Sequence, residues 1–370
     1  MNLIHLNEAF QMLKRYVYVK IHDFTKYSGT PEEICQQIIE GCWNGTFFQV
    51  STGHFKAFYM RDFSYCVEAL LYLGYKEKVW KTLQYALQTY ATNNKLTTTI
   101  AHDKPVDIFF YAPDTLPLLL RSLRIAKAFD LVETYKLFIE QEIKKYYIHT
   151  IDPETGLVRP KKFSSIKDHA YRYSSCYDNS MAGLLQHEAI ALQLIHPLKK
   201  FDYKKILIAN FWNGSYFNDD MVSKHIAGDA NVFPYWCGVI DDTTFLKKSL
   251  TALRRVGLDK PLPLRYTKNN PSKKYFPFWL IARNYEGNTI WLHLGLCFID
   301  IVRKIDTPLA KKYLSQYTEL IQKYKTFPEV LNPTGEPYAT LGYCCDEGML
   351  WCSYYLWLLH AGKRTLLFKI

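Results

Sequence analysis

The feature that most constrains the fold of this chain is a helical hydrophobic period that recurs from one end of the sequence to the other. Segments with a strand-like alternation are few, so we predict a nearly all-α protein. We expect helices over residues 2–20, 31–41, 62–74, 76–91, 113–128, 130–147, 178–194, 199–209, 229–239, 242–255, 288–304, 307–325 and 345–361.

The predicted helices come in pairs, with tight connections such as Gly74-Tyr75 and Ile240-Asp241-Asp242 inside a pair and long loops between pairs. Pairs begin near residues 62, 113, 178, 229 and 288, and the helix near 345 is expected to pair with the N-terminal one. Six helical hairpins of this kind favour a closed array. We therefore predict an (α/α)6 barrel formed by residues 1–370 as a single domain, because no Gly-, Pro- or Ser-rich linker interrupts the sequence.

Polar residues recur at the start of the first helix of each pair. Taken alone, each is explained by N-capping, since Asp, Asn, Ser and Thr bind the free amides of a helix start. In a closed ring, however, the inner helices are parallel, and their N-termini would gather all six sets around one depression. The sets are Arg61-Asp62, Pro113-Asp114, Tyr177-Asp178-Asn179-Ser180, Asp229-Ala230-Asn231, Gly287-Asn288-Thr289 and Cys345-Asp346-Glu347.

Composition narrows the class of protein further. The net charge is +11, but the basic residues are scattered, so neither nucleic acid nor a membrane is an expected partner. The nine cysteines are irregularly spaced in apolar stretches, which favours buried thiols over a disulfide framework. Neither a secretory signal nor an apolar run long enough to span a membrane is visible, so a cytoplasmic location is expected.

Two carboxylates lie in segments suited to glycoside hydrolysis, which needs one carboxyl group to protonate the leaving oxygen and another to act on the anomeric carbon or a water. Asp178 lies in Ser174-Ser175-Cys176-Tyr177-Asp178-Asn179-Ser180, at a helix start. Glu329 lies in a loop rich in Pro and Gly that leads to the last helix.

These two segments resemble motifs of the inverting glycosidases of the six-hairpin superfamily, namely glycoside hydrolase families 63, 37 and 100. Their Ser-Gly-aromatic-Asp-Asn-Ser-Pro segment carries the general acid, which implies that role for Asp178. Their C-terminal Glu followed by an Asn-Pro-Thr-Gly turn implies that Glu329 is the base. The sequence departs from the first motif at Cys176 and Met181, and it places acids at Asp346 and Glu347, so Glu347 is a rival base.

Further segments resemble the same superfamily over residues of about 40–360. Tyr59-Met60-Arg61-Asp62 resembles its Arg-Asp segment, residues 229–234 resemble a segment of the related family 15, and residues 287–291 resemble its Gly-Pro-x-Trp segment. Together with the helix-start pattern and the aromatic residues, these segments predict a substrate-binding set of Tyr59, Arg61, Asp62, Asp114, Tyr177, Asn179, Asn231, Trp236, Trp291 and Glu347.

The aromatic content of 16% has two expected uses. Most of these side chains should fill the space between the helix rings, and a minority should stack on apolar sugar faces. The aromatic residues expected on the loops at the helix N-termini are Trp43, Phe48, Tyr59, Tyr111, Tyr177, Trp236, Trp291 and Tyr338.

The resemblance implies an inverting, exo-acting hydrolase of a small α-linked, gluco-configured saccharide. Asp178 would be protonated and Glu329 ionised, with the carboxyl groups roughly 6.5–9.5 Å apart so that a water fits between them. No cofactor and no metal ion are expected, because the histidines lack metal-ligand spacing and no phosphate-binding Gly-rich loop occurs.

Three alternatives remain open at this stage. A sugar epimerase would use a histidine pair, for which His225 and His293 are candidates, and a uronide-acting enzyme would suit the basic charge. A carbohydrate-binding barrel that has lost its chemistry is the third.

Overall fold

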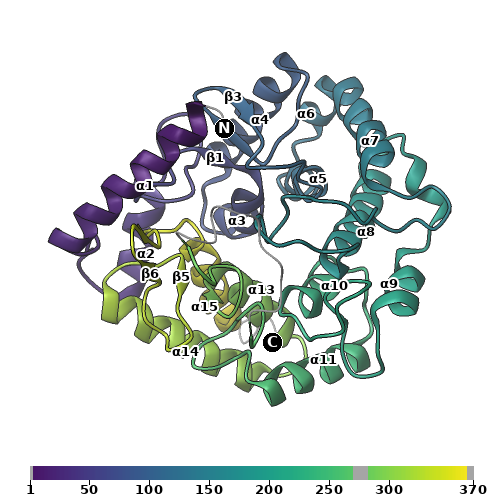
Figure 1. Ribbon diagram of the computed structural model, residues 1–370. Helices are drawn as coiled ribbons and strands as arrows, with labels where there is room; N and C mark the ends of the chain where they lie inside the picture. Colours follow the sequence, from purple (N-terminus) through teal and green to yellow (C-terminus); the bar gives the residue numbers. More distant parts are fainter. Residues whose placement is uncertain (1–2, 270–281, 365–370) are drawn as a thin grey trace.

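In the computed structural model, which describes residues 3–269 and 282–364, six helices form an inner ring (Figure 1). Each of them contacts the next, and the last contacts the first, so the ring is closed. The inner helices are α3 (Met60–Tyr72), α5 (Thr115–Ile125), α8 (Cys176–Ala191), α10 (Phe233–Trp236), α13 (Leu292–Val302) and α15 (Cys352–Arg364).

A second set of helices packs around this ring and completes the hairpins (Figure 1). The outer helices are α4 (Lys76–Thr92), α6 (Phe129–Thr134), α7 (Lys136–Thr150), α9 (Tyr203–Phe211), α11 (Thr243–Val256), α14 (Thr307–Tyr324) and α2 (Pro31–Gly41). The architecture is therefore the predicted all-α (α/α)6 barrel. One pairing was predicted wrongly, because α15 packs against α2, whereas α1 (Leu3–His22) lies against strand β7.

Hydrophobic patterning explains the two layers. Outer helix α11 buries one stripe that includes Leu246, Leu250 and Leu253, whereas α13 of the inner ring is buried on nearly all sides. Close packing also fixes a glycine in α13. A Cβ on Gly295 would lie 2.0 Å from the Tyr317 hydroxyl and 2.3 Å from the Pro263 carbonyl oxygen, so no larger residue fits.

Short strands connect the helices. β1 (Phe58–Tyr59) immediately precedes α3, β4 (Ile290–Trp291) immediately precedes α13, and both therefore mark the N-terminal end of the inner ring. β1 pairs with β2, β2 with β3, β4 with β5 and β6 with β7, all antiparallel. The remaining strands and 3₁₀ turns are β2 (Thr99–Ala101), β3 (Lys104–Val106), β5 (Val330–Leu331), β6 (Ala339–Thr340), β7 (Tyr343–Cys344), η1 (Pro197–Lys200) and η2 (Asp229–Asn231).

Four predicted helices differ from the observed ones, and one of them, 199–209, is the turn η1 followed by helix α9. The segment 130–147 is divided at Tyr135 into α6 and α7, and 229–239 is the turn η2 followed by the short helix α10. The last helix begins at Cys352 rather than near 345, because the preceding backbone bonds to other loops instead of to itself. Cys345 donates its amide to Tyr338, and Gly348 has a φ of +64° where its backbone lies against Thr52.

Most of the described aromatic side chains belong to the hydrophobic core or pack against it. Every cysteine is buried and unpaired, and burial raises the pKa of thiols such as Cys66 and Cys176. Among residues 3–269 and 282–364, no helix is both long and apolar enough to cross a membrane.

Candidate active site

Asp178 lies in the first turn of inner helix α8, and Ser175 caps that helix. The Ser175 hydroxyl accepts from the Asp178 amide at 3.0 Å and donates to Asp178 Oδ2 at 2.6 Å. The other oxygen, Oδ1, is buried and meets no donor at hydrogen-bond geometry among the described residues. Burial raises the pKa of Asp178, although the Arg172 guanidinium opposes the shift.

Glu329 lies just before β5, and its carbonyl oxygen accepts from the amide of Leu292, the first residue of α13, at 3.4 Å. Glu329 and Asp178 therefore share the N-terminal end of the inner ring. The Glu329 carboxylate is buried and accepts from the Tyr285 hydroxyl, the Tyr343 hydroxyl at 3.4 Å and the Asp346 amide at 2.9 Å. Burial raises the pKa of Glu329 to about 7, and the donated hydrogen bonds oppose this shift.

Asp346 fixes the loop that holds Glu329. The two residues are joined twice, since the Glu329 amide also donates to the Asp346 carbonyl at 2.9 Å. The Asp346 carboxylate accepts from the Ser51 hydroxyl, from the His54 and Phe55 amides at 2.9 and 3.0 Å, and lies 3.1 Å from His54 Nδ1. Despite burial, these partners lower the pKa of Asp346, and Asp346 raises the pKa of His54.

Arg61 is held by two acids on neighbouring segments. Its Nε lies 2.6 Å from Asp114 Oδ2, and its Nη1 lies 3.2 Å from Asp168 Oδ2. The Tyr177 hydroxyl also donates to Asp114 at 2.9 Å. All three donor groups of the guanidinium have protein partners, and this network ties α3, α5 and α8 together at the mouth of the ring.

Two predicted residues beside this network remain accessible. Asp62, in the first turn of α3, is partly exposed. Burial raises the pKa of Asp62 to about 7, Arg61 opposes the shift, and Asp168 adds to it. Tyr59, on β1, is partly buried and lines a pocket of about 710 Å³ beside the ring.

A second buried charge cluster lies next to Asp178. Arg172 Nη1 is 2.6 Å from Asp229 Oδ2, and Lys167 Nζ is 3.0 Å from Asp229 Oδ1 and 3.3 Å from Asp219 Oδ1. Arg172 is thus bound by Asp229 and Asp219, whereas Asp168 pairs with Arg61. This cluster places positive charge beside Asp178 without a direct ion pair to it.

Several other predicted binding residues use their polar atoms inside the protein. Asn179 accepts from the Val158 amide and donates to Ser174 and Ser175, while Asn231 bonds the backbone of Phe217 and Ala227. The Trp236 indole donates to Tyr354, and the Trp291 indole donates to the Tyr285 carbonyl. These contacts position the loops around the ring.

The carboxylate of Glu347, the rival base, contacts neither Asp178 nor Glu329 but residues at the N-terminal end of the chain. Its carboxylate pairs with Arg15 of α1 and accepts from the Thr25 amide at 3.3 Å. The pair joins the N-terminal helix to the loop that precedes α15. Its geometry is that of an anchor for α1.

Tyr285, Tyr343 and His54 were not predicted, although the tyrosines contact Glu329 and His54 contacts Asp346. Tyr285 lies two residues before the Gly287-Asn288-Thr289 segment, and Tyr343 directly precedes Cys344. Proximity to those motifs is the only sequence signal for the tyrosines, and nothing in the sequence marks His54.

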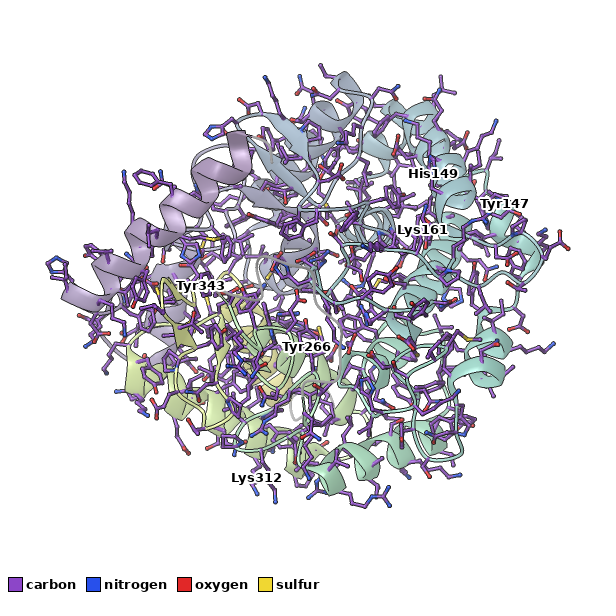
Figure 2. All side chains as sticks on the ribbon, viewed as in Figure 1. Tyr147, His149, Lys161, Tyr266, Lys312 and Tyr343 are labelled. Atoms are coloured by element: carbon purple, nitrogen blue, oxygen red, sulfur yellow. The ribbon has the colours of Figure 1, made fainter. Side chains whose placement is uncertain are left out.

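Figure 2 shows Tyr266 near the centre of the ring and Lys312 at its outer edge.

No group of three or more His, Cys, Asp or Glu residues able to hold a metal ion is found within the described part of the chain. Of the histidines weighed above, His225 Nε2 lies 3.2 Å from Asp219. His293 stacks on Tyr65 at 5.4 Å and packs on Trp351, and burial lowers its pKa to about 3. The His293 imidazole is therefore neutral and enclosed by aromatic rings, which suits a packing role better than a catalytic one.

Several solved structures of glycoside hydrolases have a similar fold. No family model and no curated protein matches the sequence. The structure is similar to that of a family 63 mannosylglycerate hydrolase from Thermus thermophilus, with a TM-score of 0.64 and 13% identity over 89% of this chain and 99% of that chain. The structure is also similar to that of a solved glycosidase, with a TM-score of 0.63 and 13% identity over 97% of this chain and 98% of that chain.

A rhamnosidase from Klebsiella oxytoca is also similar, with a TM-score of 0.63 and 12% identity over 90% of this chain and 63% of that chain. At these identities the likeness establishes the fold. The predicted resemblance to the six-hairpin glycosidases, with family 63 among them, is confirmed at that level.

Proposed function

We propose that this protein is an inverting, exo-acting glycoside hydrolase of a small α-linked, gluco-configured saccharide. The observation that carries the proposal is a pair of buried carboxyl groups, Asp178 and Glu329, at the same end of the inner ring. Burial raises the pKa of both. Perturbed carboxyl groups at the mouth of a barrel are characteristic of acid–base catalysis.

In this proposal Asp178 is the general acid. Ser175 occupies Oδ2 from one side, so the unpartnered Oδ1 is the oxygen available to carry the proton to the leaving group. Glu329 is the general base, and Tyr285, Tyr343 and the Asp346 amide fix its orientation toward the attacking water. Accessible Asp62 and Tyr59 are the proposed contacts to sugar hydroxyls and a sugar face.

The comparisons support hydrolysis more than they support a particular sugar. One similar structure is titled as a mannosylglycerate hydrolase and another as a rhamnosidase with rhamnose bound, so the fold serves more than one sugar. The gluco configuration rests on the motif resemblance alone.

The function is tested by an activity screen on chromogenic and natural α- and β-glycosides. On any substrate that is cleaved, proton NMR should detect the inverted anomer first, because a water held by Glu329 attacks opposite to the leaving group. A first-formed product with the retained configuration would contradict the mechanism, and no hydrolysis across the panel would contradict the function.

The pH dependence of hydrolysis follows from the base. Glu329 must be ionised, and its pKa is raised to about 7, so kcat/KM should fall about tenfold per pH unit below pH 7. The Tyr285→Phe variant removes a donor that lowers this pKa, so its acid limb should move to higher pH. An acid limb that stays in place in Tyr285→Phe would contradict Glu329 as the titrating base.

A further inference from the structure

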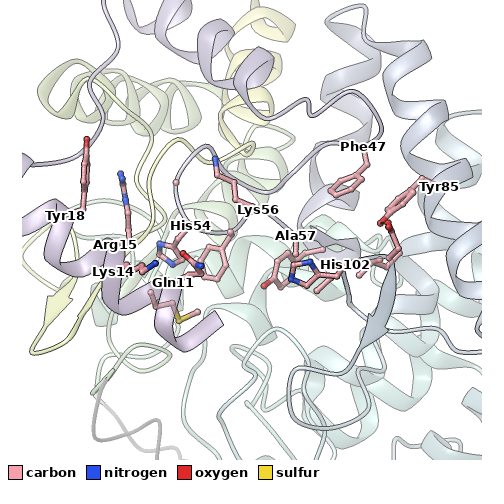
Figure 3. Close-up of a pocket in the computed structure, with 17 residues that line it drawn as sticks. Gln11, Lys14, Arg15, Tyr18, Phe47, His54, Lys56, Ala57, Tyr85 and His102 are labelled. Atoms are coloured by element: carbon pink, nitrogen blue, oxygen red, sulfur yellow. Dashed lines mark hydrogen bonds between the residues drawn. The ribbon is translucent and has the colours of Figure 1, made fainter. Parts of the chain in front are cut away.

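A pocket of about 710 Å³ lies between α1 and the loops at the mouth of the ring. Figure 3 shows side chains of α1 on one side, Phe47, Tyr85 and His102 on the other, and His54 and Lys56 between them. The proposed roles of Asp178 and Glu329 do not use this pocket, and neither residue lines it.

The polar lining consists mainly of donors. Lys14, Arg15 and Lys56 are cationic, and His54 and His102 lie beside them. Asp103 is the one carboxylate among the described lining residues, and it already accepts from the Tyr85 hydroxyl at 2.8 Å. A lining of ammonium, guanidinium and imidazole groups calls for a ligand rich in acceptor oxygens.

Two of these side chains each have a buried nitrogen that lacks a hydrogen-bond partner. Arg15 pairs with Glu347 behind the pocket through Nη2, which leaves its buried Nε without a hydrogen-bond partner. His54 faces Asp346 through Nδ1, and its buried Nε2 has no partner either. The His54 side chain is only 4% exposed, so an unpartnered nitrogen there costs free energy unless a ligand meets it.

The rest of the lining suits a sugar ring. Phe47 and Tyr85 stack with centroids 4.7 Å apart, and Phe55 packs edge-on against Tyr59 at 5.8 Å. Flat apolar rings next to cations can hold both the body and the charge of an acidic saccharide.

Two residues of the pocket lining are linked to the candidate active site. His54 is paired with Asp346, whose amide binds Glu329, and Tyr59 precedes the Arg61-Asp62 segment in the chain. A ligand in the pocket therefore lies next to the residues that hold the proposed base.

We propose that this pocket binds the anionic group, a carboxylate or a phosphate, of an acidic saccharide. The inference rests on the proposed function for the sugar character of the ligand, whereas the preference for negative charge rests on the lining itself. The acidic saccharide would be the substrate, with the charged group held by Lys14, Lys56 and His54.

The test measures binding rather than turnover, so it is separate from the test of hydrolysis. Calorimetry on the Asp178→Asn protein compares hexuronates and hexose 6-phosphates of the gluco, galacto and manno series with their parent hexoses, and inorganic phosphate is titrated alone. At least one acidic sugar should bind about tenfold more tightly than its parent at low salt, and the difference should shrink at high salt.

Charge variants locate the site. Lys14→Gln with Lys56→Gln should remove most of the preference, whereas Lys20→Gln, the same change on α1 outside the lining, should leave it intact. Equal binding of every acidic sugar and its parent would overturn the proposal, as would a preference that survives the double variant. Selective binding of free phosphate without any acidic sugar would overturn the saccharide assignment. Wild-type protein that binds an acidic sugar selectively but hydrolyses nothing would contradict the proposed function and retain the pocket.

Discussion

Asp178→Asn should lower kcat for glycosides with poor leaving groups by roughly a thousandfold, since a positioned general acid contributes on this scale. The amide keeps the shape of the carboxyl group and can still accept from the Ser175 hydroxyl, so the fold of α8 should be unchanged. Steady-state rates on the best substrate from the activity screen measure the effect.

The leaving group separates a lost acid from a damaged fold. In a 2,4-dinitrophenyl glycoside of the same sugar, the 2,4-dinitrophenolate leaves without being protonated. Asp178→Asn should therefore retain most of its activity on that substrate. Asp241→Asn, an exposed change on the tight connection before α11, serves as the matched control and should behave as wild type. Full activity of Asp178→Asn on the natural substrate would remove Asp178 from the catalytic role.

Glu329→Gln should abolish hydrolysis of both kinds of glycoside, because activation of the attacking water is needed whatever the leaving group. The expected loss is again about a thousandfold or more. Azide, an anion that needs no base, should restore turnover in this variant, and the glycosyl azide formed should have the inverted configuration.

Glu347→Gln is the informative comparison, because the sequence left Glu347 as a rival base. Its carboxylate pairs with Arg15, so we expect a lower melting temperature and a small effect on kcat. A large loss of kcat in Glu347→Gln, with Glu329→Gln still active, would exchange the two assignments.

The order of the helices and all but one of their pairings could be predicted from the sequence, because hydrophobic period is a local property. Gly74, with a φ of +95°, lies in the predicted tight connection between α3 and α4, as expected. Asp178 and Glu329 could be named as candidates for the same reason, since each lies in a short motif whose residues are neighbours in the chain. Their catalytic roles remain predictions.

The surroundings of these carboxyl groups could not be predicted in the same way. Asp346 accepts from Ser51, 295 residues away, and Tyr285 reaches Glu329 across 44 residues. Such partners are set when the ring closes and brings distant loops together. The first and last parts of the chain meet there, so no local pattern records the contact.

The sequence by itself determined an all-α ring of hairpins with polar residues at the helix N-termini, because helix periodicity and helix-start chemistry act over a few residues. Only the tertiary structure decided which of those residues are tied up in ion pairs, which carboxyl groups are buried enough to have raised pKa values, and that α1 closes a cationic pocket beside them. Burial and electrostatic pairing depend on the packing of distant segments, and that packing exists only in the folded ring.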